Sequence, residues 1–318
     1  MRDGRRWLGE ALDSALAECG PDDEVIVVDD GSRDQPEQVI PRDPRVRLLV
    51  QPPLGIVPAL ERGRAACRAP FIARLDADDV ALPGRIEAQL AAFAADPALV
   101  AIGGRARVRR EDGPVPQGMA EYVAWINGLV EPARELLVES PLFHPAVTFS
   151  ADAVAAVGGY RDGDLPEDYD LWLRLVAAGG RIANAPRDVV LLRDRADRLT
   201  RTDPRYRPDA FRAVKMQWLA ARLGGRALRV GVWGAGKAAR PWLRWVRDAG
   251  HALQLVVDPF QSGERQGQPI RPPEALRDAA LDLLLVAVGS RGARALIRDA
   301  ITALRPDWRE GERWWAVA

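Results

Sequence analysis

The sequence predicts an α/β protein with two domains, in which short apolar strands alternate with amphipathic helices. Several short apolar runs end at Asp, Gly or Ser, as buried strands that run into turns do. The segments between these runs carry apolar residues at helical spacing. A second strand–helix series begins after Gly224 and Gly225, and a length of 318 residues is compatible with two domains.

The first series of elements fills the N-terminal hundred residues and is expected to form a parallel sheet. The expected strands cover residues 25–28, 46–50, 70–75 and 100–102, and the expected helices cover residues 5–18, 59–66 and 83–95. Pro83 suits the first turn of the last of these helices.

The middle of the chain is less regular. Residues 111–150 show no clean period, residues 167–178 are expected to be helical, and residues 193–210 are expected to be loop. After a helix at about 209–222, the second series has expected strands at 228–233, 253–257, 281–288 and 314–317 and a helix at 292–304. The expected division is therefore a domain at 1–203, a helical linker at 204–226 and a domain at 227–318.

Composition narrows the class of protein. Lys+Arg and Asp+Glu balance at 45 each, so no global field favours nucleic acid as a partner. The two cysteines, Cys19 and Cys67, form no Cys-x-x-Cys pair, which argues against a disulfide framework or a zinc site and favours a cytosolic protein. No apolar run approaches the length needed to span a bilayer.

An acidic turn follows the strand expected at 25–28. Asp29 and Asp30 stand there, followed by Gly31 and Ser32. Parallel sheets bind ligands at the carboxyl ends of their strands, and a carboxylate in that position can accept hydrogen bonds from a base or a ribose. An ordinary turn is the alternative, because Asp-Gly is common in turns.

A second acidic segment, Asp-Ala-Asp-Asp at residues 76–79, follows the strand expected at 70–75. In extended geometry Asp76 and Asp78 would point to the same face. Two close carboxylates repel, and a hard cation such as Mg²⁺ or Mn²⁺ would relieve this repulsion and could bridge a diphosphate leaving group. A solvated loop is the alternative. The buried strand before it and the other acidic strand end favour the functional interpretation.

Glu167 and Asp168 open the helix expected at 167–178. Acids at a helix N-terminus cap the helix and complement its dipole, which is a sufficient structural explanation. The functional interpretation makes Asp168 a general base that takes the proton from an acceptor hydroxyl group.

These three segments, in this order, resemble the family 2 glycosyltransferases of the GT-A fold. The resemblance spans about residues 1–203 and includes Gly-Gly-Tyr at 158–160 before Glu-Asp-Tyr-Asp-Leu-Trp-Leu-Arg at 167–174. It implies a GT-A sheet and the inverting transfer of a sugar from a nucleotide-diphosphate sugar to a glycan or lipid-linked acceptor. Peripheral contact with the inner face of the cell membrane is compatible with such an acceptor.

The resemblance also implies roles for individual residues. The implied nucleotide and metal contacts are Asp29, Asp30 and Ser32 at the base and ribose, and Asp76 and Asp78 at the ribose, the diphosphate and a divalent metal ion. Asp168 would be the catalytic base, with Glu167 beside it.

Two further residues fit this pattern. His144, in Pro-Leu-Phe-His-Pro, would line the acceptor pocket, and a packed histidine is the equal alternative. Arg74 would pair with an acid or a phosphate.

The chain departs from the family pattern in two places. It begins Met-Arg-Asp-Gly, where relatives have a strand that ends in a sequence such as Pro-Val-Arg-Asp-Gly, so we expect a mis-assigned start and a missing first strand. A stop codon in frame immediately before Met1 would contradict this. Relatives also often carry a histidine within 193–199, where this chain has Arg195. Arginine suits a diphosphate and cannot ligate a metal, so we expect weaker metal dependence than usual.

The C-terminal unit carries a weaker pattern. Gly234 and Gly236 follow a strand and Asp258 ends the next one, as at the start of a dinucleotide-binding unit, but Ala239 stands at the third glycine position. The unit resembles small Rossmann-like domains of sugar-modifying enzymes. A second nucleotide site at Gly234, Gly236 and Asp258 is one interpretation, and a non-binding domain that mediates assembly is the other.

Three other functions stay open at this point. A nucleotidyltransferase would share the acidic metal site, but the Gly-rich phosphate loop it needs is not evident near the N-terminus. An NAD-dependent oxidoreductase would use residues 227–318, which supply no obvious proton donor. A truncated or non-catalytic nucleotide-sugar-binding protein would follow from a missing first strand.

Overall fold

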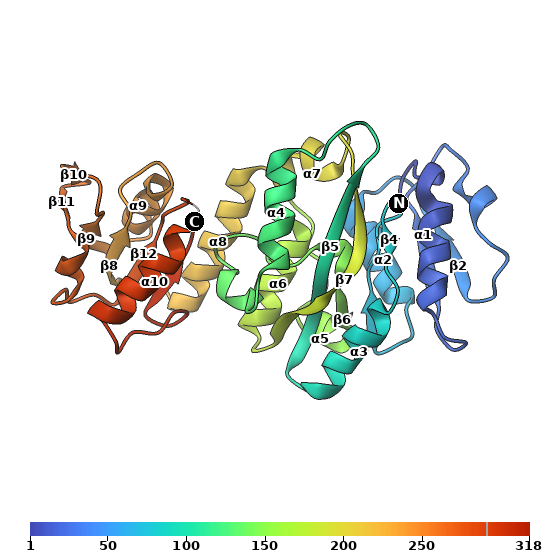
Figure 1. Ribbon diagram of the computed structural model, residues 1–318, viewed down its shortest axis with the longest axis horizontal. Coiled ribbons are helices and arrows are strands. Elements are labelled where there is room, and N and C mark those ends of the chain that lie inside the picture. Colours follow the sequence, from blue (N-terminus) through green and yellow to red (C-terminus); the bar gives the residue numbers. More distant parts are fainter. Residues whose placement is uncertain (291) are drawn as a thin grey trace. The chain divides into compact units, whose positions relative to one another are not determined.

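The computed structural model describes residues 1–290 and 292–318 and divides into two compact units (Figure 1). The first unit contains Met1–Ala133 and Ser140–Phe211, and the second contains Arg134–Glu139 and Arg212–Ala318. Each unit has its own sheet system and apolar core.

The first unit begins with a two-stranded parallel sheet, β1 (Val25–Asp29) and β2 (Val46–Val50). Helix α1 (Arg5–Glu18) buries Leu8 and Leu12 against Val27 of β1, which explains its helical apolar spacing. Helix α2 (Ile56–Ala66) follows β2.

The chain also pairs with β1 at its first residue. The amino group of Met1 donates a 2.6 Å hydrogen bond to the backbone oxygen of Val28, and the backbone oxygen of Met1 accepts one of 2.8 Å from Asp30. These two bonds follow the pattern of a parallel ladder on the edge of β1 that β2 leaves free.

A five-stranded sheet forms the larger part of this unit. Its strands lie in the order β3 (Phe71–Ala73), β6 (Thr148–Ser150), β5 (Leu99–Arg110), β7 (Arg181–Asp194) and β4 (Val80–Ala81). Only β5 and β7 pair in parallel, and the other three pairings are antiparallel. The expectation of a wholly parallel sheet is therefore wrong. The short strand β6 enters between β3 and β5 from an irregular segment, and such a connection imposes no parallel direction.

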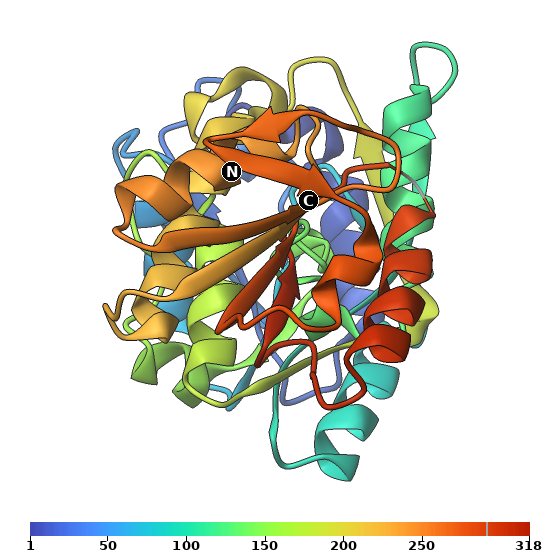
Figure 2. The same cartoon turned by 90° about the vertical axis from the view of Figure 1, so that its left-hand side faces the viewer.

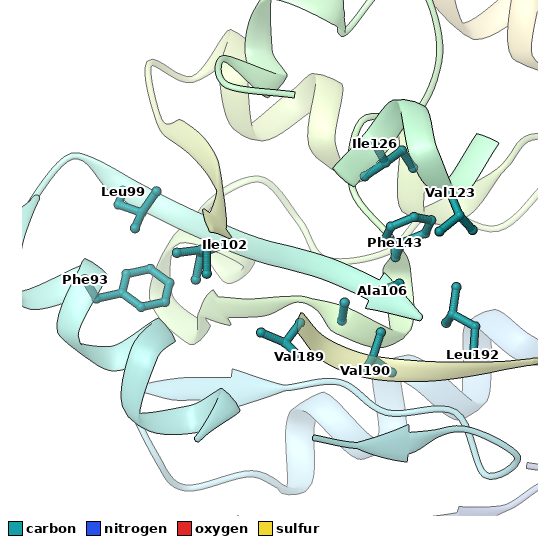
Figure 3. Close-up of a cluster of buried hydrophobic side chains, with 12 residues drawn as sticks. Phe93, Leu99, Ile102, Ala106, Val123, Ile126, Phe143, Val189, Val190 and Leu192 are labelled. Carbon is teal, nitrogen blue, oxygen red and sulfur yellow. The ribbon is translucent and has the colours of Figure 1, made fainter. Parts of the chain in front are cut away.

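The core of this unit lies around β5 and β7 (Figure 3). Helix α3 (Arg85–Ala95) contributes Phe93, and helix α4 (Gln117–Asn127) contributes Val123 and Ile126. The labelled strand residues of this cluster are Leu99, Ile102 and Ala106 of β5 and Val189, Val190 and Leu192 of β7. Both α4 and β7 lie where no such element was expected.

The remaining helices of this unit follow in chain order. They are α5 (Ala151–Ala156), α6 (Glu167–Ala177) and α7 (Leu199–Thr202), and the 3₁₀ turns are Pro36–Val39, His144–Ala146 and Pro204–Tyr206. A further 3₁₀ turn, Pro132–Glu135, begins in this unit and ends in the second. Residues 193–210, expected to be loop, therefore contain the end of β7, α7, a 3₁₀ turn and the start of α8 (Pro208–Leu223).

The second unit contains a six-stranded sheet, whose strands are coloured orange to red in Figure 2. Its order is β10 (Glu264–Arg265), β11 (Gln268–Arg271), β9 (Ala252–Val257), β8 (Arg229–Trp233), β12 (Leu283–Val286) and β13 (Trp314–Ala316). All pairings except β10–β11 are parallel. With helices α9 (Ala239–Asp248) and α10 (Ala293–Leu304) and the 3₁₀ turn Pro273–Leu276, it is compatible with the expected Rossmann-like unit.

A short segment from the middle of the chain, residues 134–139, packs with this second unit. The Glu135 carboxylate pairs with Arg298 of α10 at 2.7 Å, and the Lys215 Nζ atom donates a 2.5 Å hydrogen bond to the backbone oxygen of Val138. Val138 also packs against the apolar core of the unit. The sequence pattern had assigned this segment to the first domain.

None of the helices in the described part of the chain combines the length and apolar character that crossing a bilayer would require.

Candidate active site

The acidic residues 76–79 lie in a turn rather than in a strand. Strand β3 ends at Ala73, and the N–H group of Asp79 donates a 3.1 Å hydrogen bond to the backbone oxygen of Asp76. This turn brings carboxylate oxygens of Asp76, Asp78 and Asp79 within 4.8 Å of one another. The expected convergence of Asp76 and Asp78 is present, but strand alternation does not cause it, and Asp79 is a third member.

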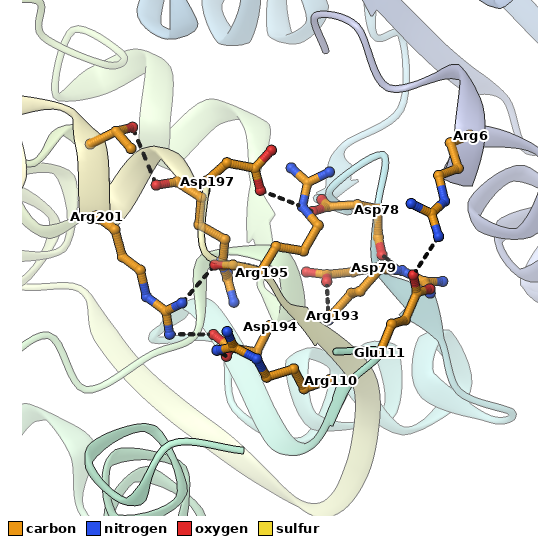
Figure 4. A network of polar contacts seen from close by, with 12 residues as sticks. Arg6, Asp78, Asp79, Arg110, Glu111, Arg193, Asp194, Arg195, Asp197 and Arg201 are labelled. Atoms are coloured by element: carbon orange, nitrogen blue, oxygen red, sulfur yellow. Dashed lines mark hydrogen bonds and ion pairs between the residues drawn. The ribbon is translucent and has the colours of Figure 1, made fainter. Parts of the chain in front are cut away.

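The end of β7 holds this acidic loop in place (Figure 4). The backbone N–H of Arg193 donates a 2.7 Å hydrogen bond to Asp79, and its Nε donates one of 2.9 Å to the backbone oxygen of Asp78. The guanidinium group of Arg193 also pairs with Glu10 of α1 at 2.5 Å and with Glu111. Only 4% of the Arg193 side chain is exposed. This buried arginine therefore connects the acidic loop, helix α1 and the segment at Glu111.

Asp194, the next residue, anchors the segment that follows β7. Its fully buried carboxylate accepts hydrogen bonds from Arg110 of β5 at 2.9 Å and from Arg201 of α7 at 2.6 Å (Figure 4). The segment between Asp194 and α7 contains Arg195 and is therefore held at the acidic loop.

Arginine side chains already pair with two of the three acids. Arg74 Nη2 lies 2.5 Å from Asp76 Oδ1, and Arg195 Nε lies 3.3 Å from Asp78 Oδ2. The Arg195 guanidinium group also stacks on the Trp7 ring of α1, with its carbon 4.0 Å from the ring centroid. The other terminal nitrogen of Arg74, Nη1, is buried and has no hydrogen-bond partner among the described residues.

The three acids differ in their affinity for protons. Burial opposes ionisation of Asp76, but the charge and hydrogen bond of Arg74 outweigh it and lower the pKa of Asp76 to about 2. Burial and the negative charge of Asp76 raise the pKa of Asp78. Burial and the charges of Asp76 and Asp78 raise the pKa of Asp79 to about 8. A cation at this cluster would favour the ionised form of all three acids.

Asp29 and Asp30, the two acids at the end of β1, have separate roles. The Asp29 carboxylate accepts hydrogen bonds from the N–H and hydroxyl groups of Ser32. The Asp30 carboxylate accepts hydrogen bonds from Gln51 Nε2 at 2.7 Å and from the N–H groups of residues 54 and 55, both at 2.9 Å. Asp30 therefore holds the turn that begins α2, a structural role that the sequence did not predict.

Glu167 and Asp168 form a second acidic pair, in the first turn of α6. The hydroxyl group of Tyr206 lies 2.7 Å and 2.8 Å from the two carboxylate oxygens of Glu167, which is only 1% exposed. Asp168 is half-buried and accepts a hydrogen bond from the Tyr169 N–H group. Burial and the charge of Glu167 raise the pKa of Asp168 to about 7. An acid with this pKa can exchange a proton near neutral pH.

Arg74 acts electrostatically on both acidic clusters, since its charge lowers the pKa of Asp76 and of Asp168. His144 lies near the same arginine but is buried, with its Nε2 atom 2.8 Å from the hydroxyl oxygen of Tyr160. Burial, aided by the Arg74 charge, lowers the pKa of His144 well below its usual value, so the ring is neutral. These contacts favour the packed-histidine alternative over a role in the acceptor pocket.

In the second unit, the loop at 234–236 and Asp258 lie together as expected. The Asp258 carboxylate accepts four hydrogen bonds, from the N–H of Ala235, the N–H groups of residues 260 and 261, and the Gln261 side chain. Four bonds match the acceptor capacity of a carboxylate, so Asp258 closes this loop. Gly234 has a φ of +112°, and a Cβ there would lie 2.7 Å from a backbone oxygen at the end of β12. In this structure both residues shape the loop after β8.

Comparison with known proteins decides the family. The family model Glycosyl transferase family 2 matches residues 3–151. An uncharacterized glycosyltransferase of Haemophilus influenzae is 30% identical over 208 residues, which are 61% of this chain and 72% of that protein. The chain belongs to glycosyl transferase family 2.

Other relatives of this family 2 glycosyltransferase agree. The amylovoran biosynthesis glycosyltransferase AmsE of Erwinia amylovora is 30% identical over 58% of this chain and 69% of its own length. An Escherichia coli protein named UDP-Gal:alpha-D-GlcNAc-diphosphoundecaprenol beta-1,3-galactosyltransferase is 30% identical over 56% of this chain and 66% of its own length.

The fold agrees with the family as well. The crystal structure of S. aureus TarS 1-349 superposes with a TM-score of 0.50 at 16% identity, over 78% of this chain and 77% of that one. The expectations of a GT-A fold and of a glycosyltransferase are thereby confirmed.

Proposed function

We propose that this family 2 glycosyltransferase transfers the sugar of a nucleotide-diphosphate sugar to an acceptor hydroxyl group with inversion, and that Asp168 is its general base. The observation that carries the proposal is the half-buried carboxylate of Asp168, whose pKa of about 7 suits proton exchange at neutral pH. Asp168 would take the hydroxyl proton as the acceptor oxygen bonds to the anomeric carbon. The bond from that carbon to the diphosphate would break, and the nucleotide diphosphate would leave.

The acidic loop would hold the donor. Asp76, Asp78 and Asp79 offer hard oxygen donors within 4.8 Å of one another, and the buried Oδ2 of Asp79 has no hydrogen-bond partner in the described part of the chain. This donor set fits Mg²⁺ or Mn²⁺. A bound ion would supply positive charge that stabilises the leaving diphosphate. The buried Nη1 of Arg74, which has no partner among the described residues, would donate to the same group, and Asp29 with Ser32 would face the nucleoside.

Arg195 would help the metal ion to stabilise the negative charge of the leaving diphosphate. It stands over Asp78, stacked on Trp7, and its planar guanidinium group suits a diphosphate. Because its positive charge already neutralises one of the acids, we expect the enzyme to depend less on the metal than a site of unpaired acids would.

The acceptor would be a glycan or a lipid-linked glycan. The relative whose name specifies a diphosphoundecaprenol-linked acceptor supports the lipid-linked class. With such an acceptor the reaction would take place at the inner face of the cell membrane.

Nucleotide diphosphate release from a panel of nucleotide sugars tests the proposal. We expect Asp168→Asn to lower the rate by about 10²–10⁴-fold, the usual contribution of a general base, while nucleotide binding persists. Asp152→Asn is a matched control, because Asp152 is an exposed acid in the first turn of α5. Unchanged turnover in Asp168→Asn would remove the base assignment. Nucleotide-sugar binding with no turnover by the unaltered protein would instead favour a non-catalytic binding protein.

A further inference from the structure

Tyr206 makes a specific contact with the acidic pair from a distant part of the chain. It ends the 3₁₀ turn Pro204–Tyr206, and its hydroxyl group lies almost equally far from both oxygens of Glu167, at 2.7 Å and 2.8 Å. The Asp203 carboxylate caps this turn through the N–H group of Arg205, and the Tyr206 N–H group bonds to the backbone oxygen of Asp203. The backbone at Tyr206 is therefore fixed by its own turn.

This turn ends the segment of residues 194–206, whose first residues lie at the acidic loop of residues 76–79. At one end, Asp194 is anchored by two arginines, and Arg195 lies at Asp78. At the other end, Tyr206 is bound to Glu167. One short stretch of chain thus touches the acids of the donor site and the pair that contains Asp168.

Charged and titratable groups face the acidic pair from several elements. Arg205 Nη1 lies 3.9 Å from Glu167 and 3.7 Å from Asp162, and these distances make it a weaker partner of Glu167 than Tyr206 is. Arg74, beyond the end of β3, acts on both acids of the pair through its charge. Tyr160, buried beside His144, is influenced by the charges of both acids.

We propose that Tyr206 is a positioning residue of the glycosyl transfer, which fixes Glu167 as a charged carboxylate beside Asp168 and thereby keeps Asp168 a competent base. This inference rests on the proposed role of Asp168. A hydrogen bond to a carboxylate favours its charged form, whereas burial disfavours it. Burial does raise the pKa of Glu167, and the Tyr206 hydroxyl group opposes that effect. The retained charge of Glu167 then adds to the burial that raises the pKa of Asp168.

Loss of the hydroxyl group should change the order in which the pair releases its protons. Glu167 would then hold its proton to higher pH and would carry less negative charge at a given pH. With that charge reduced, the pKa of Asp168 would fall. Asp168 would become a weaker base that is ionised at lower pH.

Tyr206→Phe removes only this hydroxyl group, and Tyr122→Phe is a matched control, because the Tyr122 hydroxyl group donates to the backbone oxygen of Ser140 instead. In Tyr206→Phe we expect the acidic limb of the kcat/KM profile to move by about one pH unit toward lower pH, with a lower kcat on the plateau. In Tyr122→Phe the limb should not move. An unmoved limb in Tyr206→Phe, with or without a lower rate, would overturn the inference.

A measurement without turnover separates this inference from the proposed function. Carboxyl ¹³C chemical shifts can be titrated in the full chain, with the Asp168 signal assigned by its loss in Asp168→Asn. A lower Asp168 pKa in Tyr206→Phe supports the inference even if the protein proves inactive on every nucleotide sugar. An unchanged pKa in an active enzyme overturns the inference and leaves the proposed function standing. As a further check, Tyr206→Phe should add little to Glu167→Gln, and additive effects of the two changes would contradict the coupling.

Discussion

The backbone N–H group of Arg193 donates a 2.7 Å hydrogen bond to Asp79, so the last turn of the acidic loop is fixed by the end of β7. The two residues are 114 positions apart. The side chain of the same arginine reaches the backbone oxygen of Asp78, Glu10 and Glu111. The shape of the acidic loop therefore depends on Arg193, a residue outside the loop itself.

Arg193→Leu should weaken both the fold and the donor site. The change removes a buried guanidinium group whose acid partners are partly exposed, so we expect a loss of about 1–3 kcal/mol in unfolding free energy and a higher KM for the donor. Thermal unfolding and initial rates measure these effects. Arg107→Leu removes a mostly exposed ion pair and should change stability by no more than about 1 kcal/mol. Equal effects of the two changes would show that Arg193 has no special role.

The raised pKa of Asp168 predicts opposite pH dependence for activity and for stability. The base must be ionised, so turnover should rise with pH through about 7. The contribution of Asp168 to stability should instead fall as the pH rises. Because the folded pKa lies above the unfolded value, the native protein binds the extra proton between about pH 4 and pH 7. The contribution of Asp168 to stability is full below about pH 4 and is lost as the pH rises through about 7.

Asp168→Asn imitates the protonated acid and checks this sign. The variant and the unaltered protein should unfold at similar temperatures at pH 4, and the variant should be the more stable by a few degrees at pH 8. The comparison by thermal unfolding needs no substrate. A variant that is equally destabilised at both pH values would contradict the raised pKa.

Arg195→Ala should make turnover more dependent on the metal. The change removes the positive charge that pairs with Asp78 and should lower the rate in the presence of a chelator by about tenfold, equivalent to about 1.4 kcal/mol of lost charge stabilisation. Activity with and without added Mg²⁺ or Mn²⁺ is the measurement. Arg181→Ala serves as the control, since that arginine pairs with Asp96 and is mostly exposed. Complete dependence on metal in the unaltered protein would rule out the sharing of charge by Arg195.

Substitution of Asp29 and of its neighbour Asp30 should affect different properties, donor binding in the first case and stability in the second. Asp30→Ala leaves Gln51 and two backbone N–H groups without their acceptor, so we expect a loss of about 1–3 kcal/mol in stability. Asp29→Ala removes a carboxylate that, among the described residues, accepts side-chain hydrogen bonds only from the two donor groups of Ser32, and it should mainly weaken donor binding. Unfolding temperature and nucleotide affinity distinguish the two. A larger stability loss in Asp29→Ala would reverse the assignment.

Local sequence was sufficient to predict elements with a clear period. Helix α1 and strand β2 have the expected bounds, because their apolar residues repeat at helical or strand spacing along one buried face. Strand β7 was not expected, because Asn184, Pro186 and Asp188 interrupt its apolar pattern. It becomes a strand by pairing along β5, a partner some 80 residues away in the sequence. Propensity carries no information about such a partner.

The same limit applies to the site. The acids of the three motifs could be found from the sequence, since each follows or opens a recognisable element. Tyr206 could not, because it lies in a stretch without a period and meets Glu167 across 39 residues. The structural role of Asp30 could not be predicted either, because the N–H groups that donate hydrogen bonds to its carboxylate belong to the turn before α2. Motifs indicate which side chains are available, and the tertiary contacts decide which of them are already engaged.

The membership of residues 134–139 in the second unit has a consequence for how this protein can be recombined. The chain passes between the units three times, so a gene fusion or exchange made at the single boundary near residue 211 does not deliver a whole module. Glu135 and Val138 would stay behind with the first unit, while α10 and Lys215 would leave with the second. A transplanted C-terminal unit should therefore need residues 134–139 supplied as a separate peptide or by circular permutation.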